Sequence, residues 1–222
     1  MSQQVNWASF FTVSEESYLC SACQEQLQEI IGETCQTCSR PFDNLDAQYI
    51  VGERCYDCVR WEEDAEWSGY LQKNDSIYLY NDFLKEVLSQ YKFRGDYILA
   101  KIFAQKIQEK LKDIDYDLLV PIPLSKERLF ERGFNQSEAF IREAGLIATN
   151  LLHRTHSEKQ SKKSRKDRIH LPQVFRIQED VQHKNIVLID DIYTTGSTLR
   201  HAAKLLKSRG AKSVSSLTLA RG

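Results

Sequence analysis

The chain has 222 residues, 41% of them hydrophobic, and its 30 Lys and Arg against 31 Asp and Glu give a formal net charge of −1. This length suits one domain, or one domain with a small additional module, and no apolar run approaches the length of a membrane span. Residues 1–4 lack the basic start and apolar core of a signal peptide, so we expect a cytoplasmic protein rather than a membrane or secreted one.

The charge is divided unevenly along the chain. Residues 1–70 carry three Lys and Arg against thirteen Asp and Glu, a formal −10, whereas residues 71–222 carry 27 against 18, a formal +9. We therefore predict a cysteine-rich module with a lead-in and a linker over 1–70, and a second domain over 71–222. Because contacts to nucleic-acid phosphates need cations, any such surface belongs to the second domain. Simple solvation of both parts is the alternative.

Six cysteines punctuate the first part as three C-x-x-C pairs: Cys20 and Cys23, Cys35 and Cys38, Cys55 and Cys58. In a cytoplasmic chain such pairs are typical of metal ligation rather than of disulfides. The spacing from Cys35 to Cys58 predicts a closed four-thiolate site for a structural Zn²⁺ ion. A redox pair is the alternative for any single C-x-x-C, but repeated pairs without a thioredoxin-like context weaken it. Cys20 and Cys23 either join an alternative ligand set or are left over.

After an acidic segment at 61–74, which we interpret as the linker, strands and helices alternate. Strands are predicted over 76–80, 118–123, 186–189 and 214–219, and helices over 83–91, 99–107, 135–144 and 199–209. Residues 146–152 fit either a helix or a strand, and residues 153–173 predict a basic, exposed and mobile loop. This alternation predicts an α/β fold with a parallel sheet flanked by helices.

The most informative pattern lies near the C-terminus, where a buried strand is followed by two acids and then by a hydroxyl-rich turn into a helix. The acids are Asp190 and Asp191, and the turn is Thr194, Thr195, Gly196, Ser197 and Thr198. Amides and hydroxyls at a helix N-terminus bind anions, and ligands bind at the carboxyl ends of parallel strands. Because carboxylates repel a bare phosphate, the ligand should also present hydroxyls or Mg²⁺, as ribose 5-phosphate does. A purely structural turn with a Thr or Ser N-cap is the alternative.

Three further clusters carry positive charge. Lys126, Arg128 and Arg132 follow the proline-ended strand at 118–123 within reach of an anion, and the alternative is a surface turn with a basic helix start. The basic loop contains Arg154, Lys159, Lys162, Lys163, Arg165, Lys166 and Arg168. These cations suit closure over pyrophosphate or contact with single-stranded DNA, and a solvated insertion is the alternative. The run at 91–94 interleaves aromatic and basic residues that could stack bases, but a helix end with aromatics in the core is the preferred interpretation.

The pattern at 186–199 resembles the phosphoribosyl pyrophosphate (PRPP) loop of the type I phosphoribosyltransferases. The resemblance implies that Asp190 and Asp191 take the ribose hydroxyls and that residues 194–198 wrap the 5-phosphate. It also implies that Mg²⁺ accompanies PRPP and that pyrophosphate meets Lys126, Arg128 and Arg132. The fold implied is a phosphoribosyltransferase-like parallel sheet behind a small zinc-ribbon-like module.

Together with the cysteine module, the motifs Tyr-Lys-Phe-Arg-Gly-Asp at 91–96, Val-Pro-Ile-Pro at 120–123 and Arg-Gly-Phe-Asn-Gln at 132–136 resemble the ComF family. The resemblance covers nearly the whole chain. It implies a cytoplasmic role in natural transformation, handling incoming single-stranded DNA with a ComFA-type helicase and a DprA-type recombination mediator, and association with the inner face of the membrane through such partners.

This chain departs from the family pattern in two places. Many members have a further C-x-x-C near the first methionine, so the resemblance makes Cys20 and Cys23 half of a lost site and leaves Cys35, Cys38, Cys55 and Cys58 as the intact one. The basic loop also lacks the usual Glu-Arg-x-x-Asn run. We expect a competence protein with a PRPP-binding domain. The alternative is a phosphoribosyltransferase enzyme of nucleotide metabolism that uses PRPP and Mg²⁺, although no base-recognition motif follows the loop to name an acceptor.

Overall fold

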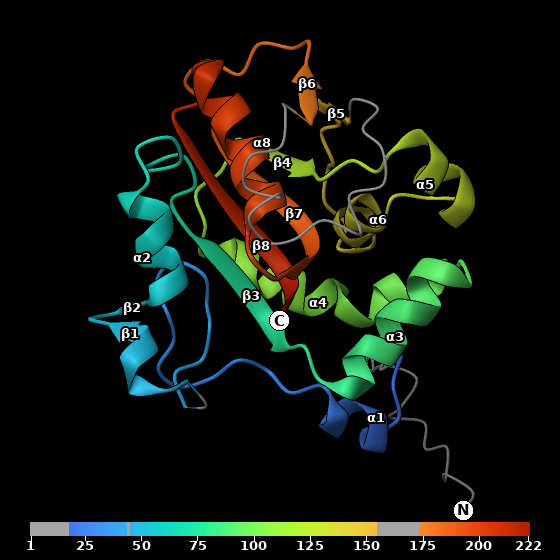
Figure 1. Ribbon diagram of the computed structural model, residues 1–222. Helices are drawn as coiled ribbons and strands as arrows, with labels where there is room; N and C mark the ends of the chain where they lie inside the picture. The colour runs from blue at the N-terminus through green and yellow to red at the C-terminus, as the bar shows by residue number, and fades with distance from the viewer. Residues whose placement is uncertain (1–17, 44, 155–173) are drawn as a thin grey trace, which may run out of the picture.

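The computed structural model describes residues 18–43, 45–154 and 174–222 (Figure 1). In the first part the elements are α1 (Ser21–Gln26), β1 (Ile50–Val51), β2 (Arg54–Cys55) and α2 (Tyr56–Glu63). They are followed by β3 (Asn74–Leu79), α3 (Asp82–Phe93), α4 (Ala100–Lys112), β4 (Leu118–Pro121), α5 (Lys126–Arg132) and α6 (Gln136–Glu143). The last are β5 (Leu152–Arg154), β6 (Phe175–Ile177), β7 (Asn185–Tyr193), α8 (Ser197–Ser208) and β8 (Ser213–Arg221).

The centre of the molecule is a parallel sheet with the strand order β3-β8-β7-β4. Side chains of β7 alternate between its two faces, as a strand buried on both sides requires. Ile186 and Leu188 pack in one core cluster, and Val187 and Ile189 pack in the other. The predicted α/β fold with a parallel sheet is therefore confirmed.

Helices α3, α4 and α6 contribute to the core on one face of the sheet. The starts of α3 and α6 follow from side-chain caps: Asn81 accepts a hydrogen bond from the amide of Leu84, and Asn135 accepts from the amides of Ser137 and Glu138. These contacts confirm the predicted helix starts near residues 82 and 135. The other face is covered by α8, by the β5–β6 hairpin and by the four cysteines at 35–58.

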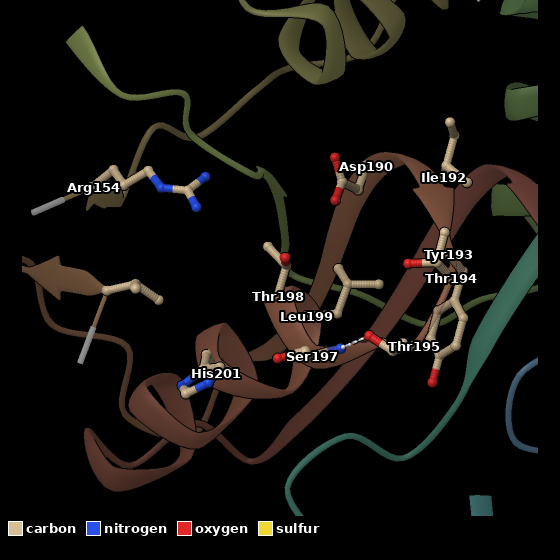
Figure 2. Close-up of a pocket in the computed structure, with 12 residues that line it drawn as sticks. Arg154, Asp190, Ile192, Tyr193, Thr194, Thr195, Ser197, Thr198, Leu199 and His201 are labelled. Atoms are coloured by element: carbon tan, nitrogen blue, oxygen red, sulfur yellow. Dashed lines mark hydrogen bonds between the residues drawn. The ribbon is translucent and has the colours of Figure 1, made fainter. Parts of the chain in front are cut away.

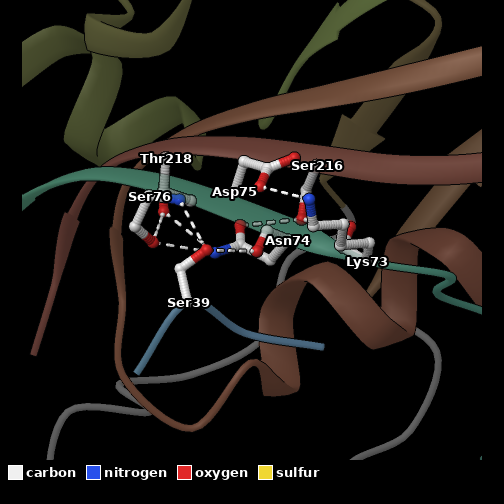
Figure 3. A network of polar contacts seen from close by, with 7 residues as sticks. All are labelled: Ser39, Lys73, Asn74, Asp75, Ser76, Ser216 and Thr218. Atoms are coloured by element: carbon white, nitrogen blue, oxygen red, sulfur yellow. Dashed lines mark hydrogen bonds and ion pairs between the residues drawn. The ribbon is translucent and has the colours of Figure 1, made fainter. Parts of the chain in front are cut away.

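The cysteine module is joined to the outer strand β3 by a buried polar network (Figure 3). The hydroxyl of Ser39 donates to the backbone oxygen of Asn74 at 3.0 Å and accepts from the amide of Ser76 at 3.2 Å. The Asn74 side chain donates to Ser76 at 2.8 Å and accepts from Ser216 at 2.8 Å. Because the amide of Asn74 also donates to the backbone oxygen of Thr37 at 2.8 Å, the module covers an otherwise open sheet edge.

Three parts of the structure differ from the sequence prediction. The segment at 61–74 is not an open linker, because α2 continues to Glu63 and the side chains of Trp61, Trp67 and Leu71 are buried. Residues 146–151 form no helix, and the chain enters β5 only at Leu152. That strand pairs with β6 in a small antiparallel sheet that the sequence analysis did not predict. The boundary at residue 70 stays a prediction.

Within the described residues, the structure has no helix with the length and apolar character needed to cross a membrane.

Candidate functional site

A pocket opens where β7 turns into α8 (Figure 2). Its lining comprises Arg154, Val174, Asp190, Ile192, Tyr193, Thr194, Thr195, Gly196, Ser197, Thr198, Leu199 and His201. We call residues 194–198 the anion loop. All five of its residues, one of the two predicted acids and one cation of the predicted basic loop are therefore gathered around a single pocket.

The shape of the anion loop depends on Gly196. This residue has φ +76°, and a Cβ atom there would lie 2.1 Å from the hydroxyl oxygen of Tyr193, so no other residue type fits without a shift of the aromatic ring. Gly196 is also the N-cap of α8 and offers its first amides no side-chain acceptor. Amides at such a position favour an anionic ligand, and the helix dipole adds to the attraction.

Asp190 lies against the pocket within β7. Strand β4 pairs with β7 only as far as Pro121 and Ile189, whereas β8 accompanies β7 to Tyr193. The acids therefore lie inside β7 rather than after it, but beyond the end of β4. Proline stops β4 because it has no N–H to donate, and this leaves the Asp190 side of β7 open toward the pocket.

Burial, together with the neighbouring charge of Asp191, raises the pKa of Asp190 to about 7. One carboxylate oxygen of Asp190 accepts hydrogen bonds from the hydroxyl of Ser137 at 3.3 Å and from the amide of Asp191 at 3.0 Å. The side chain of Asp191 instead pairs with Lys92 of α3. The two adjacent acids are thus in different electrostatic environments, and only Asp190 lines the pocket.

Two arginines from the predicted clusters come close enough to the acids to influence them electrostatically. Burial lowers the pKa of Arg132, and the carboxylates of Asp191 and Asp190 oppose this shift. Burial and the charge of Arg128 lower the pKa of Arg154, and Asp190 again opposes it. Of these arginines Arg154 lines the pocket, whereas Arg132 and Arg128 of α5 are connected with the site only through the influence of charge.

The remaining predicted cations are not brought to the pocket by described contacts. Lys126 begins α5 on its exposed surface. The other candidate cations of the basic loop are Lys159, Lys162, Lys163, Arg165, Lys166 and Arg168, and these lie outside the described residues. Of the candidate cations of that loop, the structure describes Arg154, whose guanidinium lies 5.7 Å from the centre of the Phe175 ring.

The predicted metal ligands form a compact cluster. Cys35, Cys38, Cys55 and Cys58 are all buried, and their sulfur atoms lie within 4.8 Å of one another. The sulfur atoms of Cys38 and Cys55 are 3.7 Å apart, close to the ~3.8 Å that tetrahedral zinc with Zn–S bonds of about 2.3 Å requires. Hydrogen bonds among these thiols lower the pKa of Cys35 and raise the pKa of Cys55 and of Cys58, so the four groups titrate together. This donor set fits a structural Zn²⁺ ion.

Cys20 and Cys23 lie apart from this cluster. Cys20 is the N-cap of the short helix α1 and is exposed, and Cys23 lies within that helix. Neither belongs to the group of four sulfur atoms. The structure therefore gives no support to Cys20 and Cys23 as alternative ligands of this cluster.

Comparison with known proteins agrees with both the pocket and the cysteine cluster. Residues 130–222 match the phosphoribosyl transferase domain family, and residues 10–59 match the double zinc ribbon domain family. The chain is 39% identical to the competence protein ComFC of Bacillus subtilis over 99% of its own length and 91% of that protein. It is 36% identical to ComFC of Streptococcus pneumoniae over 94% of its own length and 90% of that protein. The chain belongs to the ComFC family.

A more distant relative is the DNA utilization protein YhgH of Escherichia coli O157:H7. It is 31% identical over 47% of this chain and 49% of that protein. As a member of the ComFC family, the chain therefore combines a phosphoribosyltransferase-type domain with a zinc-ribbon module. This confirms the family and the fold expected from its motifs.

Sequence reasoning missed several residues that shape the site. In the run at 91–94, Tyr91 is buried as the preferred interpretation required, but Phe93 is 75% exposed and Lys92 turns to Asp191. Trp61 was assigned to a linker, yet its indole nitrogen donates to the backbone oxygen of Thr195 in the anion loop at 3.0 Å. The sequence feature that could have indicated this contact is the position of Trp61, three residues after Cys58, the last cysteine of the cluster.

Proposed function

We propose that this ComFC-family chain acts in natural transformation, aiding the uptake or handling of incoming single-stranded DNA, and that its phosphoribosyltransferase-type domain binds PRPP together with Mg²⁺. One observation carries the proposal. The anion loop, with its amides at the start of α8, and the carboxylate of Asp190 line the same pocket. The amides of the anion loop can donate hydrogen bonds to a phosphate, and the carboxylate of Asp190 can accept them from the hydroxyls of a sugar.

The arrangement assigns a part to each group. The hydroxyls and amides at 194–198 would hold the 5-phosphate, and Asp190 would accept hydrogen bonds from the ribose hydroxyls. Arg154 in the pocket and Arg132 at the end of α5 carry the charge needed to attract pyrophosphate, with Lys126 and Arg128 earlier on the same helix. Asp191 pairs with Lys92, so its use by a ribose requires that pair to rearrange.

The carboxylates also fit a Mg²⁺ ion. Magnesium prefers oxygen ligands, usually keeps several waters and takes much of its shell from substrate phosphates, so one or two protein carboxylates suffice. Asp190 and Asp191 are the residues that would hold it. When bound, the ion would neutralise charge on the pyrophosphate. The Asp190 and Ser137 side chains would meanwhile orient the sugar, since Ser137 donates to Asp190.

The proposal extends to cellular partners only through the family. The names of the relatives connect them with competence and DNA utilization. By family resemblance, the partners would be a ComFA-type helicase and a DprA-type recombination mediator, in the cytoplasm or at the inner face of the membrane. Contact with single-stranded DNA belongs to the basic C-terminal part, whose net charge favours phosphates.

A phosphoribosyltransferase enzyme is the second candidate. The raised pKa of Asp190 favours it, because titratable groups with shifted pKa values gather at catalytic sites. Release of pyrophosphate from PRPP that depends on an acceptor would establish turnover. A deletion strain that loses purine salvage but transforms normally would favour this candidate, whereas loss of transformation with normal nucleotide pools would favour the competence role.

Calorimetric titration of PRPP with Mg²⁺ tests the binding proposal. We expect binding by the wild type that is lost in the double variant Asp190→Asn/Asp191→Asn and retained in Asp113→Asn. Asp113 is the matched control, since it is an exposed acid that follows α4 and precedes β4, at the amino end of the sheet. Titrations with ribose 5-phosphate and with pyrophosphate separate the two halves of the ligand. Absence of PRPP binding by the wild type would refute the proposal.

A further inference from the structure

The cysteine module contacts the anion loop directly, across 134 residues of sequence. The indole nitrogen of Trp61 donates a hydrogen bond to the backbone oxygen of Thr195 at 3.0 Å. Trp61 lies on α2, the helix that begins at Tyr56 and carries the metal ligand Cys58. The position of this indole is therefore set by the helix that the metal site anchors.

This hydrogen bond determines the direction of a peptide group in the loop. No described peptide bond is cis, and in a trans peptide the C=O and the following N–H point in opposite directions. Because the oxygen of Thr195 points to Trp61, the N–H of Gly196 points away from the module. Gly196 lines the pocket, so the Trp61 contact holds the amide at the head of α8 in one orientation.

A second connection runs through Arg221 at the end of β8. Its guanidinium donates to the sulfur of Cys38 at 3.6 Å and to the backbone oxygen of Tyr193 at 3.2 Å. It also lies 5.0 Å from the centre of the Tyr193 ring. That ring fills the space where a side chain at position 196 would be. The metal ligand Cys38 is thus linked, through Arg221 and Tyr193, to the turn of the anion loop.

Charge balance is a further connection between the cysteine cluster and the anion loop. A Zn²⁺ ion with four thiolates carries a net charge of −2, and such a charge is stable in a buried site only with compensating groups. Arg221 is such a group, because its guanidinium is buried and lies against the sulfur of Cys38. Arg200 of α8 is fully buried, pairs with Glu62 at 3.0 Å and lies 4.9 Å from the centre of the Trp61 ring. A metal-loaded cluster would therefore stabilise the charge of Arg221, while Arg200 joins the same module to α8 through Glu62.

We propose that the metal-loaded cysteine module positions the anion loop, with Trp61 as the positioning residue, and thereby sets the affinity of the loop for the phosphate group of its ligand. The proposal rests on the proposed function for the identity of that ligand, PRPP. The orientation of the loop itself is independent of any ligand. The module is thus a structural part of the ligand site as well as a metal-stabilised domain.

Two tryptophans provide a matched pair of variants for the test. Trp61 and Trp67 are both buried and lie 5.5 Å apart between ring centres. The indole N–H of Trp67 has no hydrogen-bond partner among the described residues. Trp61→Phe and Trp67→Phe therefore remove the same atoms from the same region, but only Trp61→Phe removes a hydrogen bond to the anion loop.

The experiment uses the full, zinc-loaded chain and two readouts. Hydrogen–deuterium exchange over residues 194–199, without ligand, reports the order of the loop. Calorimetry with PRPP and Mg²⁺ reports its affinity. In Trp61→Phe we expect faster exchange in this segment and affinity weaker by roughly three- to tenfold, as for loss of one hydrogen bond. Trp67→Phe should match the wild type in both, and the zinc content should be unchanged in all three proteins.

Equal exchange at 194–199 in the two variants would overturn the proposal, whatever the affinity. If the wild type does not bind PRPP, the proposed function fails, while the exchange comparison still decides whether Trp61 positions the loop. Should Trp61→Phe not fold, β-(3-benzothienyl)alanine at position 61 keeps the shape of the ring and lacks the N–H donor. It is expected to show the same faster exchange, and an unchanged rate would again overturn the proposal.

Discussion

Lys92 of α3 and Asp191 of β7 form an ion pair in which both side chains are largely buried, with 14% and 18% of their surfaces exposed. The pair places a positive and a negative charge beside Asp190. The charge on Asp191 raises the pKa of Asp190, whereas the charge on Lys92 lowers it. Asp190 therefore titrates in an environment set by its burial and by both charges of the pair.

The substitution Lys92→Met is predicted to raise the pKa of Asp190 further. It removes the positive charge that favours the ionised carboxylate and leaves the repulsion from Asp191 uncompensated. Carboxyl ¹³C chemical shifts recorded against pH give the value directly. Lys85→Met is the control, because Lys85 is an exposed residue of the same helix. An Asp190 titration that does not move in Lys92→Met would show that the ion pair has no influence on it.

Stability should depend on pH through Asp190. Its pKa is raised from 3.8 to about 7, so between these values the native state binds more protons than the unfolded state. The free energy of unfolding therefore falls as pH rises from about 4 to about 7. Asp190→Asn lacks this penalty and should exceed the wild type by roughly 1–3 kcal/mol at pH 8, with little difference near pH 4. Urea unfolding at several pH values measures the difference, and a gap that does not change with pH would contradict the prediction.

Gly196→Ala is predicted to cost more stability than Gly133→Ala. Both glycines have left-handed backbones, with φ +76° and +78°, but only Gly196 faces an obstacle, the buried ring of Tyr193. Gly133→Ala should cost about 1–2 kcal/mol for the backbone alone. Gly196→Ala adds a clash and should cost roughly 2–4 kcal/mol, with loss of anion binding. Equal unfolding free energies for the two variants would mean that the Tyr193 ring moves aside at no cost.

Two ion pairs join the module to α8 with the same N–O distance of 3.0 Å, Arg200 with Glu62 and Lys204 with Glu66. Arg200 is fully buried, whereas Lys204 and Glu66 are 32% and 57% exposed. Double-mutant cycles should therefore give a coupling of about 1–3 kcal/mol for the first pair. For the second pair we expect less than about 1 kcal/mol, since solvent screens it. Similar couplings would show that burial does not distinguish the two pairs.

Zinc content should separate the two kinds of cysteine. We expect the wild type and Cys20→Ser/Cys23→Ser to bind the same amount of zinc, because these two residues lie outside the four-sulfur cluster. Cys55→Ser should lose the ion and with it the cooperative unfolding of the module. Elemental analysis after dialysis against a weak chelator gives the stoichiometry. A lower content in the Cys20→Ser/Cys23→Ser protein would place these residues among the ligands.

The sequence predicted best where local pattern and final environment agree. Strand β7 and helix α8 were expected from an apolar run and from helical spacing, and both are buried as these patterns require. The side-chain caps Asn81 and Asn135 likewise act within three residues of themselves. The gathering of the anion loop around one pocket follows from this local order, since the loop is a continuous segment.

What escaped prediction depends on contacts between distant segments. The acidic run around Trp61 looked like a linker because its burial comes from α8, which lies far along the chain. The hairpin was missed because β5 and β6 have three residues each, too few to show a period, and are separated by a long polar segment. The partner of Lys92 is a residue of β7, and no local pattern indicates it.

The position of β8 sets the order in which this molecule can be made. β8 follows the other described strands in the sequence, yet it lies between β3 and β7 in the sheet. While the ribosome is still adding those residues, β3 has no partner and β7 has only β4, so two strand edges stay open. The cysteine module emerges early and can take up metal at once, but α8 and Arg221, which contact it, come after the other described elements. β8 must therefore be made before the sheet closes, and until then a chaperone has open edges to protect.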